Sequence, residues 1–196
     1  MHYLILRNFM EPKHCDEIIA IVKQRPSQIQ RSKGLELTTG HHIISEHRTS
    51  SELFFRHGEN PIIAEYERRI AEMTGLPVEF GEGFQFAWYK EGEYFKNHHD
   101  YFHEEYGGTQ SILSRGGQRL ITFMIYLNTL PEGAGGETEF THIGLKVRPE
   151  KGKAVVFWNV MPNWQLDDST AHAALPPAPG YEKYLLTKWI RKETFR

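Results

Sequence analysis

The chain has 196 residues, a formal net charge of −2 and one cysteine, Cys15. A single cysteine excludes an internal disulfide and a cysteine-based zinc finger, and a charge near zero gives no electrostatic reason to expect a nucleic-acid partner. No stretch approaches the roughly 18 consecutive apolar residues of a membrane-spanning helix, and the first residues lack the pattern of a secretory signal. We therefore expect one domain over residues 1–196 that is cytoplasmic and has no membrane partner.

The first part of the chain is expected to form a short strand followed by a helix. Residues 3–6 are apolar enough for a strand. Apolar residues then recur at helical spacing from Cys15 to Val22. This spacing predicts a helix over about 12–25, which Pro26 ends.

A second helix is predicted between Asn60 and Gly75. Asn60 is a favoured N-cap, Pro61 suits the first helical position, and Gly75 is typical of a helix end. The stretch 27–47 between the two helices is polar and contains only strand-like pieces. We expect residues 1–79 to be a helical support region whose helices cover one side of a sheet. The apolar residues on one face of the second helix are Ile62, Tyr66, Ile70 and Met73.

After residue 80 the pattern changes to short β-branched and aromatic runs that glycines and prolines separate. Such runs predict strands, and many short strands with glycine-rich corners are typical of a double-sheet jelly roll. The predicted fold class is therefore mostly β (α+β), with a double-stranded β-helix, or cupin-like jelly roll, over residues 80–196. Residues 103–118 contain four glycines and few large apolar residues, which indicates a flexible loop and a candidate lid. The expected strands cover residues 84–89, 120–127, 154–158 and 184–190.

The segment from His98 to Asp100 carries a candidate metal motif. On an extended strand, residues alternate between faces, so His98 and Asp100 point the same way while His99 points away. His172, near the start of another extended run, offers a third ligand. Two histidines and one carboxylate form the facial triad of non-haem Fe(II) oxygenases. In isolation, a histidine and an aspartate spaced like this on a strand are more often a surface pair.

Several further motifs, taken in order, resemble the prolyl 4-hydroxylase group of Fe(II)/2-oxoglutarate dioxygenases. No single motif is specific for this group, but the occurrence of all of them in the same order is. The resemblance is strong over residues 80–191 and looser over residues 9–79. The matching segments are residues 48–51, 89–94, 98–102, 116–119, 126–128, 135–140, 152–159, 172–176, 182–184 and 187–191.

The resemblance implies residues for the metal and for the cosubstrate. His98, Asp100 and His172 are implied as ligands of Fe(II). Lys183 matches the cation that binds the far carboxylate of 2-oxoglutarate, whereas Lys188 lies on the other face of its strand by alternation. A lone strand lysine is ordinarily solvated and a strand tyrosine ordinarily belongs to the core, so these roles rest on the resemblance. The hydroxyl groups implied at the two ends of the cosubstrate belong to Tyr89 and Tyr126.

The resemblance also implies that Arg48, Ser50 and Arg119 face a peptide substrate. Two departures from the family pattern concern the same pocket. Phe95 stands where tyrosine is frequent, which removes a hydroxyl group from the substrate side. The segment 176–180 is one residue longer than is common, which affects the register of the lysine that follows it.

The activity implied by the resemblance is hydroxylation of an unactivated carbon. It requires Fe(II), 2-oxoglutarate and O2, with ascorbate as a reductant, and it releases succinate and CO2. The implied substrate is a prolyl residue in a peptide or protein. Two alternatives stay open: the same chemistry on a free amino acid or other small molecule, and a metal-bound module that senses or binds without turnover. An open groove beside the lid favours a peptide, and a closed pocket favours a small molecule.

Overall fold

In the computed structural model, which describes residues 1–35, 42–44 and 46–196, seven antiparallel strands form the largest sheet. The four strands expected after residue 80 are all confirmed, with ends that shift by no more than one residue. Their β-branched and aromatic side chains suit a pleated, buried surface. The order across this sheet is β1 (Tyr3–Leu6), β11 (Ala154–Trp158), β8 (Arg119–Tyr126), β13 (Lys183–Arg191), β6 (Phe84–Tyr89), β5 (Ser51–Phe55) and β2 (Gln30–Arg31).

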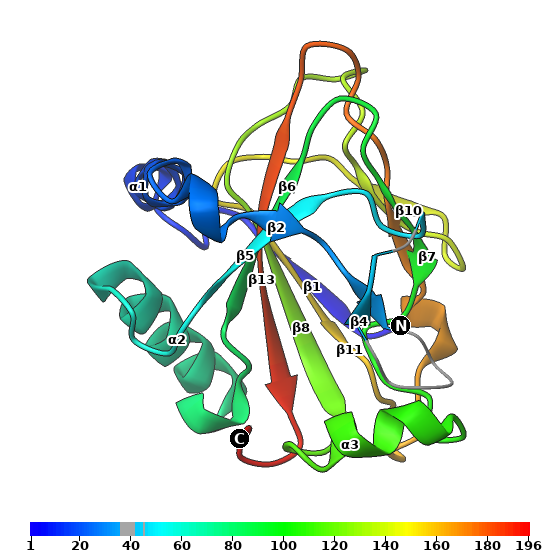
Figure 1. The fold of residues 1–196 in the computed structure, drawn as a ribbon. Coiled ribbons are helices and arrows are strands. Elements are labelled where there is room, and N and C mark those ends of the chain that lie inside the picture. Colours follow the sequence, from blue (N-terminus) through cyan, green and yellow to red (C-terminus); the bar gives the residue numbers. More distant parts are fainter. Residues whose placement is uncertain (36–41, 45) are drawn as a thin grey trace.

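A smaller antiparallel sheet packs against one face of the large sheet (Figure 1). Side chains of both sheets meet in a buried apolar layer, with Tyr126, Phe157 and Leu185 from the large sheet and Phe140 and Ala174 from the small one. The two sheets form the predicted double-stranded β-helix. The strands of the small sheet, in order, are β10 (Leu145–Val147), β9 (Thr138–Phe140), β12 (His172–Ala174) and β7 (Phe95–His98), while β3 (Gly34–Leu35) pairs only with β4 (His42–Ile43).

The two predicted helices are confirmed, and both cover the face of the large sheet that points away from the small sheet (Figure 1). Helix α1 (Pro12–Lys23) ends slightly before the expected residue 25, and α2 (Pro61–Thr74) has the expected bounds. Their apolar faces form a second buried core with the large sheet, which includes Ile18 and Tyr66. The large sheet is therefore covered on both faces.

The ends of α2 follow from its capping residues. The Asn60 side chain accepts a hydrogen bond from the Ile63 N–H at 3.0 Å, which satisfies one of the unpaired amides of the first turn. Gly75 ends the helix with a φ of 69°, a conformation that favours glycine. Met73 was predicted on the buried face but is 47% exposed, because the buried stripe ends one turn earlier, at Ile70.

The expected loop over residues 103–118 contains regular structure. A 3-10 turn (Gly107–Thr109) leads into the short helix α3 (Gln110–Leu113). At the base of the segment, the Gln118 side chain accepts a hydrogen bond from the Phe102 N–H at 2.8 Å and donates one to the Phe102 carbonyl oxygen at 2.7 Å. These two bonds tie the ends of the segment together, and its response to substrate stays a prediction.

The first 79 residues contribute more than helices to the fold. Strands β1, β2 and β5 all lie in the large sheet, where β1 pairs with β11, β5 pairs with β6, and β2 pairs with β5 at the edge. The strand-like pieces expected within residues 27–47 are β2, β3 and β4, and residues 36–41 and 45 lie outside the described residues. Among the helices that the structure describes, none is long and apolar enough to cross a membrane.

Candidate metal centre

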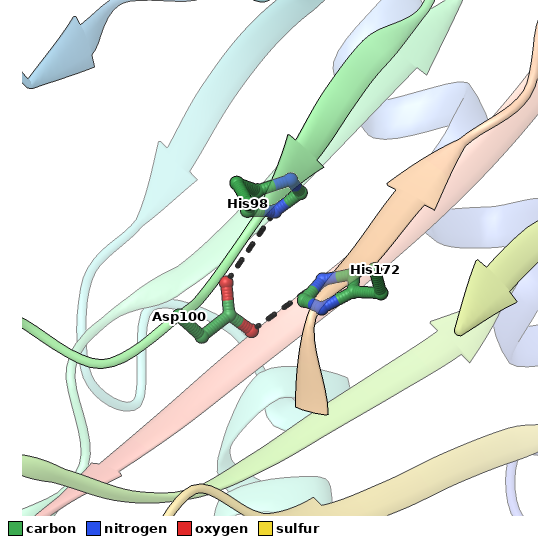
Figure 2. Close-up of side chains that lie close together, drawn as sticks. All are labelled: His98, Asp100 and His172. Atoms are coloured by element: carbon green, nitrogen blue, oxygen red, sulfur yellow. Dashed lines mark ion pairs between the residues drawn. The ribbon is translucent and has the colours of Figure 1, made fainter. Parts of the chain in front are cut away.

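Three potential metal ligands meet at one end of the small sheet. His98 ends β7, His172 begins β12, and the two residues are directly paired across these strands. Asp100 lies just beyond β7, yet its carboxylate faces both imidazoles (Figure 2). Its oxygens lie 3.7 Å from Nε2 of His98 and 3.9 Å from Nε2 of His172. Within the described part of the chain, no other three side chains with metal-ligand atoms lie this close together.

Backbone carbonyls orient both imidazoles toward the centre of this cluster. Nδ1 of His98 donates to the Lys96 oxygen at 2.8 Å, and Nδ1 of His172 donates to the Thr170 oxygen at 2.9 Å. Each bond leaves the Nε2 lone pair free to bind a metal. Burial, followed by the nearby His172, holds the pKa of His98 well below its usual value, so His98 is in the neutral form that metals bind.

Asp100 supplies the negative charge of the cluster. Burial on its own would raise the pKa of this carboxyl, but His172, His98 and Arg119 together hold it below its usual value. The Thr122 hydroxyl donates a hydrogen bond to Oδ2 of Asp100 at 2.9 Å. Two imidazoles and one carboxylate on one side of a shared centre fit the donor set of a non-haem Fe(II) site.

A pocket opens beside the three ligands. The Phe95 ring stacks on the His98 imidazole, with 3.5 Å between the ring centroids. The guanidinium of Arg48 also lies over this Phe95 ring, 4.8 Å from its centroid. The pocket therefore combines apolar walls with a few polar groups, as ligand sites commonly do. Its lining residues include Arg48, Gln85, Tyr89, Met124, Thr138 and Trp189.

Lys183 is fully buried at the start of β13. Its Nζ donates to the Gly136 carbonyl oxygen at 2.9 Å and lies 4.7 Å from the centroid of the Tyr89 ring. Burial lowers the pKa of Lys183 to about 7. The alternation along β13 places Lys188 on the opposite face, where it forms an ion pair with Glu67 of α2 at 2.7 Å.

The two predicted tyrosines lie on the same side of the large sheet as Lys183. The Tyr126 hydroxyl donates to Oγ1 of Thr138 at 2.8 Å, and burial raises the pKa of Tyr126. Thr138 lines the pocket, as does Tyr89. Tyr89 therefore lines the pocket itself, whereas Lys183 contacts Tyr89 and Tyr126 binds Thr138 of the pocket wall.

The predicted substrate residues occupy different positions around this pocket. Arg48 lines it and donates from Nε to the Ser50 hydroxyl at 3.0 Å. Ser50 is fully buried and donates in turn to the Ser32 hydroxyl at 2.9 Å. The guanidinium of Arg119 is paired with Glu82, with its Nε and Nη2 at 2.6 and 2.8 Å from the two carboxylate oxygens.

Other histidines near the motif point away from the cluster. His99 lies opposite His98, as alternation predicted, and its Nε2 is 3.2 Å from a carboxylate oxygen of the exposed Asp168. His103 pairs with Glu105 at 3.2 Å within the candidate lid. Neither side chain belongs to the group of potential metal ligands.

Two of the pocket residues, Gln85 and Trp189, were not predicted from the sequence. Gln85 accepts a hydrogen bond from Nη2 of Arg48 at 3.0 Å. The indole N–H of Trp189 is buried close to the carboxylate of Asp100. Strand alternation carried a usable signal, because Gln85 is in phase with Tyr89 on β6 and Trp189 is in phase with Lys183 on β13.

Comparison with known proteins gives a consistent result. Residues 84–191 match the model of the 2OG-Fe(II) oxygenase superfamily. The chain is 35% identical over 205 residues to the probable prolyl 4-hydroxylase 8 of Arabidopsis thaliana, a match that covers 95% of this chain and 67% of the relative. It is also 35% identical over 205 residues to prolyl 4-hydroxylase 1 of the same plant, which covers 97% of this chain and 69% of the relative.

A solved structure extends this likeness to the fold. The viral collagen prolyl hydroxylase of Paramecium bursaria Chlorella virus-1, solved as a 2OG complex, superposes with a TM-score of 0.72 at 28% sequence identity. The match covers 97% of this chain and 96% of the viral chain. The likeness therefore includes both sheets and the helices that cover them.

Proposed function

This chain belongs to the 2OG-Fe(II) oxygenase superfamily and to its prolyl 4-hydroxylase group, and we propose that it hydroxylates a prolyl residue of a peptide or protein. It is an Fe(II)- and 2-oxoglutarate-dependent dioxygenase. One observation supports the proposed site above all: His98, Asp100 and His172 converge at a pocket, and the buried Lys183 lies against Tyr89 of the pocket wall.

The proposed metal ligands are His98, Asp100 and His172. Bound Fe(II), with 2-oxoglutarate and O2, supplies oxidising chemistry in which decarboxylation to succinate and CO2 is coupled to insertion of oxygen into a C–H bond. The two imidazoles bind through Nε2, because backbone carbonyls engage both Nδ1 atoms. The apolar walls around them, including Phe95, exclude water from the reacting centre.

We assign Lys183, Tyr126 and Tyr89 to the cosubstrate. An ammonium has three donors, and Lys183 uses one of them on Gly136, so two stay available for the far carboxylate of 2-oxoglutarate. Tyr126 and Tyr89 offer hydroxyl groups on the same side of the large sheet. The shared position of these groups beside the metal ligands supports this assignment.

Arg48, Ser50 and Arg119 are the proposed substrate residues. Arg48 supports this role best, because its guanidinium lines the pocket and lies over Phe95. Ser50 is fully buried, and we assign it an indirect role in which its hydroxyl orients Arg48. Arg119 is held by Glu82 and also donates from Nη1 to the Asp100 carbonyl oxygen at 3.3 Å, so its proposed role depends on its position at the end of the candidate lid.

The remaining proposals concern the extent of the domain, the reductant and the location of the protein. Residues 1–196 are proposed to form one catalytic domain, because strands from the first 79 residues share a sheet with the later strands. Ascorbate is the proposed reductant that keeps the iron in the Fe(II) state. The proposed location is cytoplasmic, and the charge near zero argues against a nucleic-acid substrate.

The test uses a proline-rich peptide and a matched peptide in which alanine replaces each proline. Both are incubated with the protein, Fe(II), 2-oxoglutarate and ascorbate, and mass spectrometry measures the added oxygen while succinate is quantified. We expect one added oxygen on the proline peptide and none on its alanine counterpart. Succinate formation stimulated only by free amino acids or other small molecules would favour the small-molecule alternative, and no turnover with any substrate would favour a binding module.

A further inference from the structure

We propose that Thr122 and Asn159 are positioning residues that make Asp100 offer a single carboxylate oxygen to the metal. This inference rests on the metal site proposed above. Neither residue is one of the potential metal ligands, and neither lines the pocket. Their effect therefore reaches the metal only through Asp100.

Thr122 is a buried polar side chain in the middle of the large sheet. It is fully buried on β8, between Phe157 of β11 and Trp189 of β13. Alternation along β8 places it on the face that carries Met124, a residue of the pocket wall. From there the Thr122 hydroxyl donates to Oδ2 of Asp100 at 2.9 Å. A hydroxyl at this position has a charged acceptor, which makes the hydrogen bond stronger than a neutral one.

Asn159 sets the direction of that hydrogen bond. It is fully buried directly after β11, and its Nδ2 donates to Oγ1 of Thr122 at 3.0 Å. A hydroxyl has one proton and also accepts hydrogen bonds. Because the Thr122 oxygen accepts from Asn159, its proton is directed to Asp100. The two hydrogen bonds therefore run in one direction, from Asn159 to Thr122 and from Thr122 to Asp100.

The carbonyl oxygen of the Asn159 side chain also supports a role in orienting Thr122. Its Oδ1 is buried and has no hydrogen-bond partner among the described residues. A buried carbonyl oxygen without a partner costs free energy, so the amide is not explained by its own hydrogen bonding. We infer that the role of the Asn159 amide is to donate its N–H to Thr122.

This arrangement matters because of the number of coordination positions. Two histidines and one carboxylate oxygen leave three positions of an octahedral ion open. A carboxylate that binds through both oxygens occupies one of those three. Oδ1 of Asp100 lies 3.7 Å from Nε2 of His98, and Oδ2 lies 3.9 Å from Nε2 of His172. Because Thr122 binds Oδ2, the carboxylate cannot rotate freely, and in this proposal Oδ1 is the oxygen that binds the metal. The open positions are then kept for the cosubstrate and O2.

The test compares two substitutions at one position. Thr122→Val removes the hydroxyl while keeping a β-branched side chain, and Thr122→Ser keeps the hydroxyl. Co(II) is the probe, and its dissociation constant and visible absorption spectrum are measured for the wild-type chain and both variants. We expect Thr122→Val to weaken Co(II) binding by about 10–100-fold and to change the spectrum, as loss of an outer hydrogen bond to a metal ligand does elsewhere. Thr122→Ser should restore both properties.

A purely structural role gives a different result. It would lower the melting temperature of Thr122→Val while leaving the Co(II) dissociation constant and spectrum unchanged, and this would overturn the proposal. Failure of a folded Thr122→Ser variant to restore the spectrum would overturn it as well. If Thr122→Val does not fold, Asn159→Leu decides: weaker binding with an altered spectrum supports the proposal, and wild-type behaviour contradicts it. Absence of Co(II) binding by the wild-type chain would instead overturn the metal site itself.

Discussion

Nζ of Lys183 donates a hydrogen bond to the carbonyl oxygen of Gly136 at 2.9 Å, in a fully buried position. Gly136 has a φ of 76°, and a Cβ at this residue would lie only 2.6 Å from Cδ1 of Leu130. Glycine is therefore required to bring this carbonyl to the lysine. No carboxylate of the described residues lies within ion-pair distance of Lys183, so a bound anion is its expected partner.

Replacement of Lys183 by alanine should weaken binding of 2-oxoglutarate. Leaving a buried carboxylate without its cation typically costs about 2–5 kcal/mol. At about 1.4 kcal/mol per decade, the KM for 2-oxoglutarate should rise by roughly one to three orders of magnitude. Lys183→Arg should have a smaller effect, because a planar fork does not replace a point charge. Lys192→Ala, an exposed lysine just beyond the same strand, is the control and should leave this KM unchanged.

Binding of 2-oxoglutarate should depend on pH through Lys183. Burial lowers the pKa of Lys183 to about 7, so its ammonium is lost as the pH rises through that value. The affinity of the free protein for 2-oxoglutarate should then fall by up to about tenfold per pH unit above the pKa, with proton uptake on binding. Isothermal titration calorimetry with Mn(II) bound measures both effects. In Lys183→Arg the guanidinium stays charged, so a slope equal to that of the wild-type chain would contradict the assignment.

Removal of Glu67 should destabilise the fold. Its carboxylate lies 2.7 Å from Nζ of Lys188, and both side chains are buried. Breaking one side of a buried pair typically costs about 3–5 kcal/mol, because the remaining charge is left without a partner. Denaturant unfolding of Glu67→Ala measures this loss. The control is Glu72→Ala on the same helix, whose exposed pair with Arg68 contributes under about 0.5 kcal/mol. Equal stability of the two variants would show that the buried pair contributes little.

The segment 103–118 should become more protected when substrate binds. It begins close to Asp100 and ends just before Arg119, and closure over the pocket would keep water from the reacting centre. Hydrogen exchange with and without a hydroxylatable peptide measures this response. The amide of Phe102 should exchange slowly in both states, since Gln118 already binds it. Equal protection across residues 103–118 in both states would make this segment a surface connection rather than a lid.

Local sequence patterns were sufficient for most elements of the fold. Asn60 and Gly75 delimit α2 because capping depends on the chemistry of single residues. The run from Phe84 to Tyr89 predicted β6 because β-branched and aromatic side chains suit a buried strand. Helix α3 was not predicted, since one helical turn carries too few residues for a periodic pattern.

Partners that are far apart in sequence explain what was missed at the site. Thr122 reaches Asp100, and Asn159 reaches Thr122, only because β8 and β11 pair next to the metal ligands. Likewise, nothing local to Arg119 indicates that Glu82 binds its guanidinium. Alternation within a strand gives the face on which a side chain lies, but it does not give the residue that the side chain meets.

Formation of succinate from 2-oxoglutarate, measured together with bound iron, tests the central claim that His98, Asp100 and His172 hold one catalytic Fe(II). The comparison uses the wild-type chain, His172→Ala, and His142→Ala as an exposed control. The wild-type chain and His142→Ala should bind iron and form succinate with a prolyl peptide. His172→Ala should do neither, while its circular dichroism stays that of the folded chain. Stoichiometric iron and full activity in His172→Ala would contradict the account.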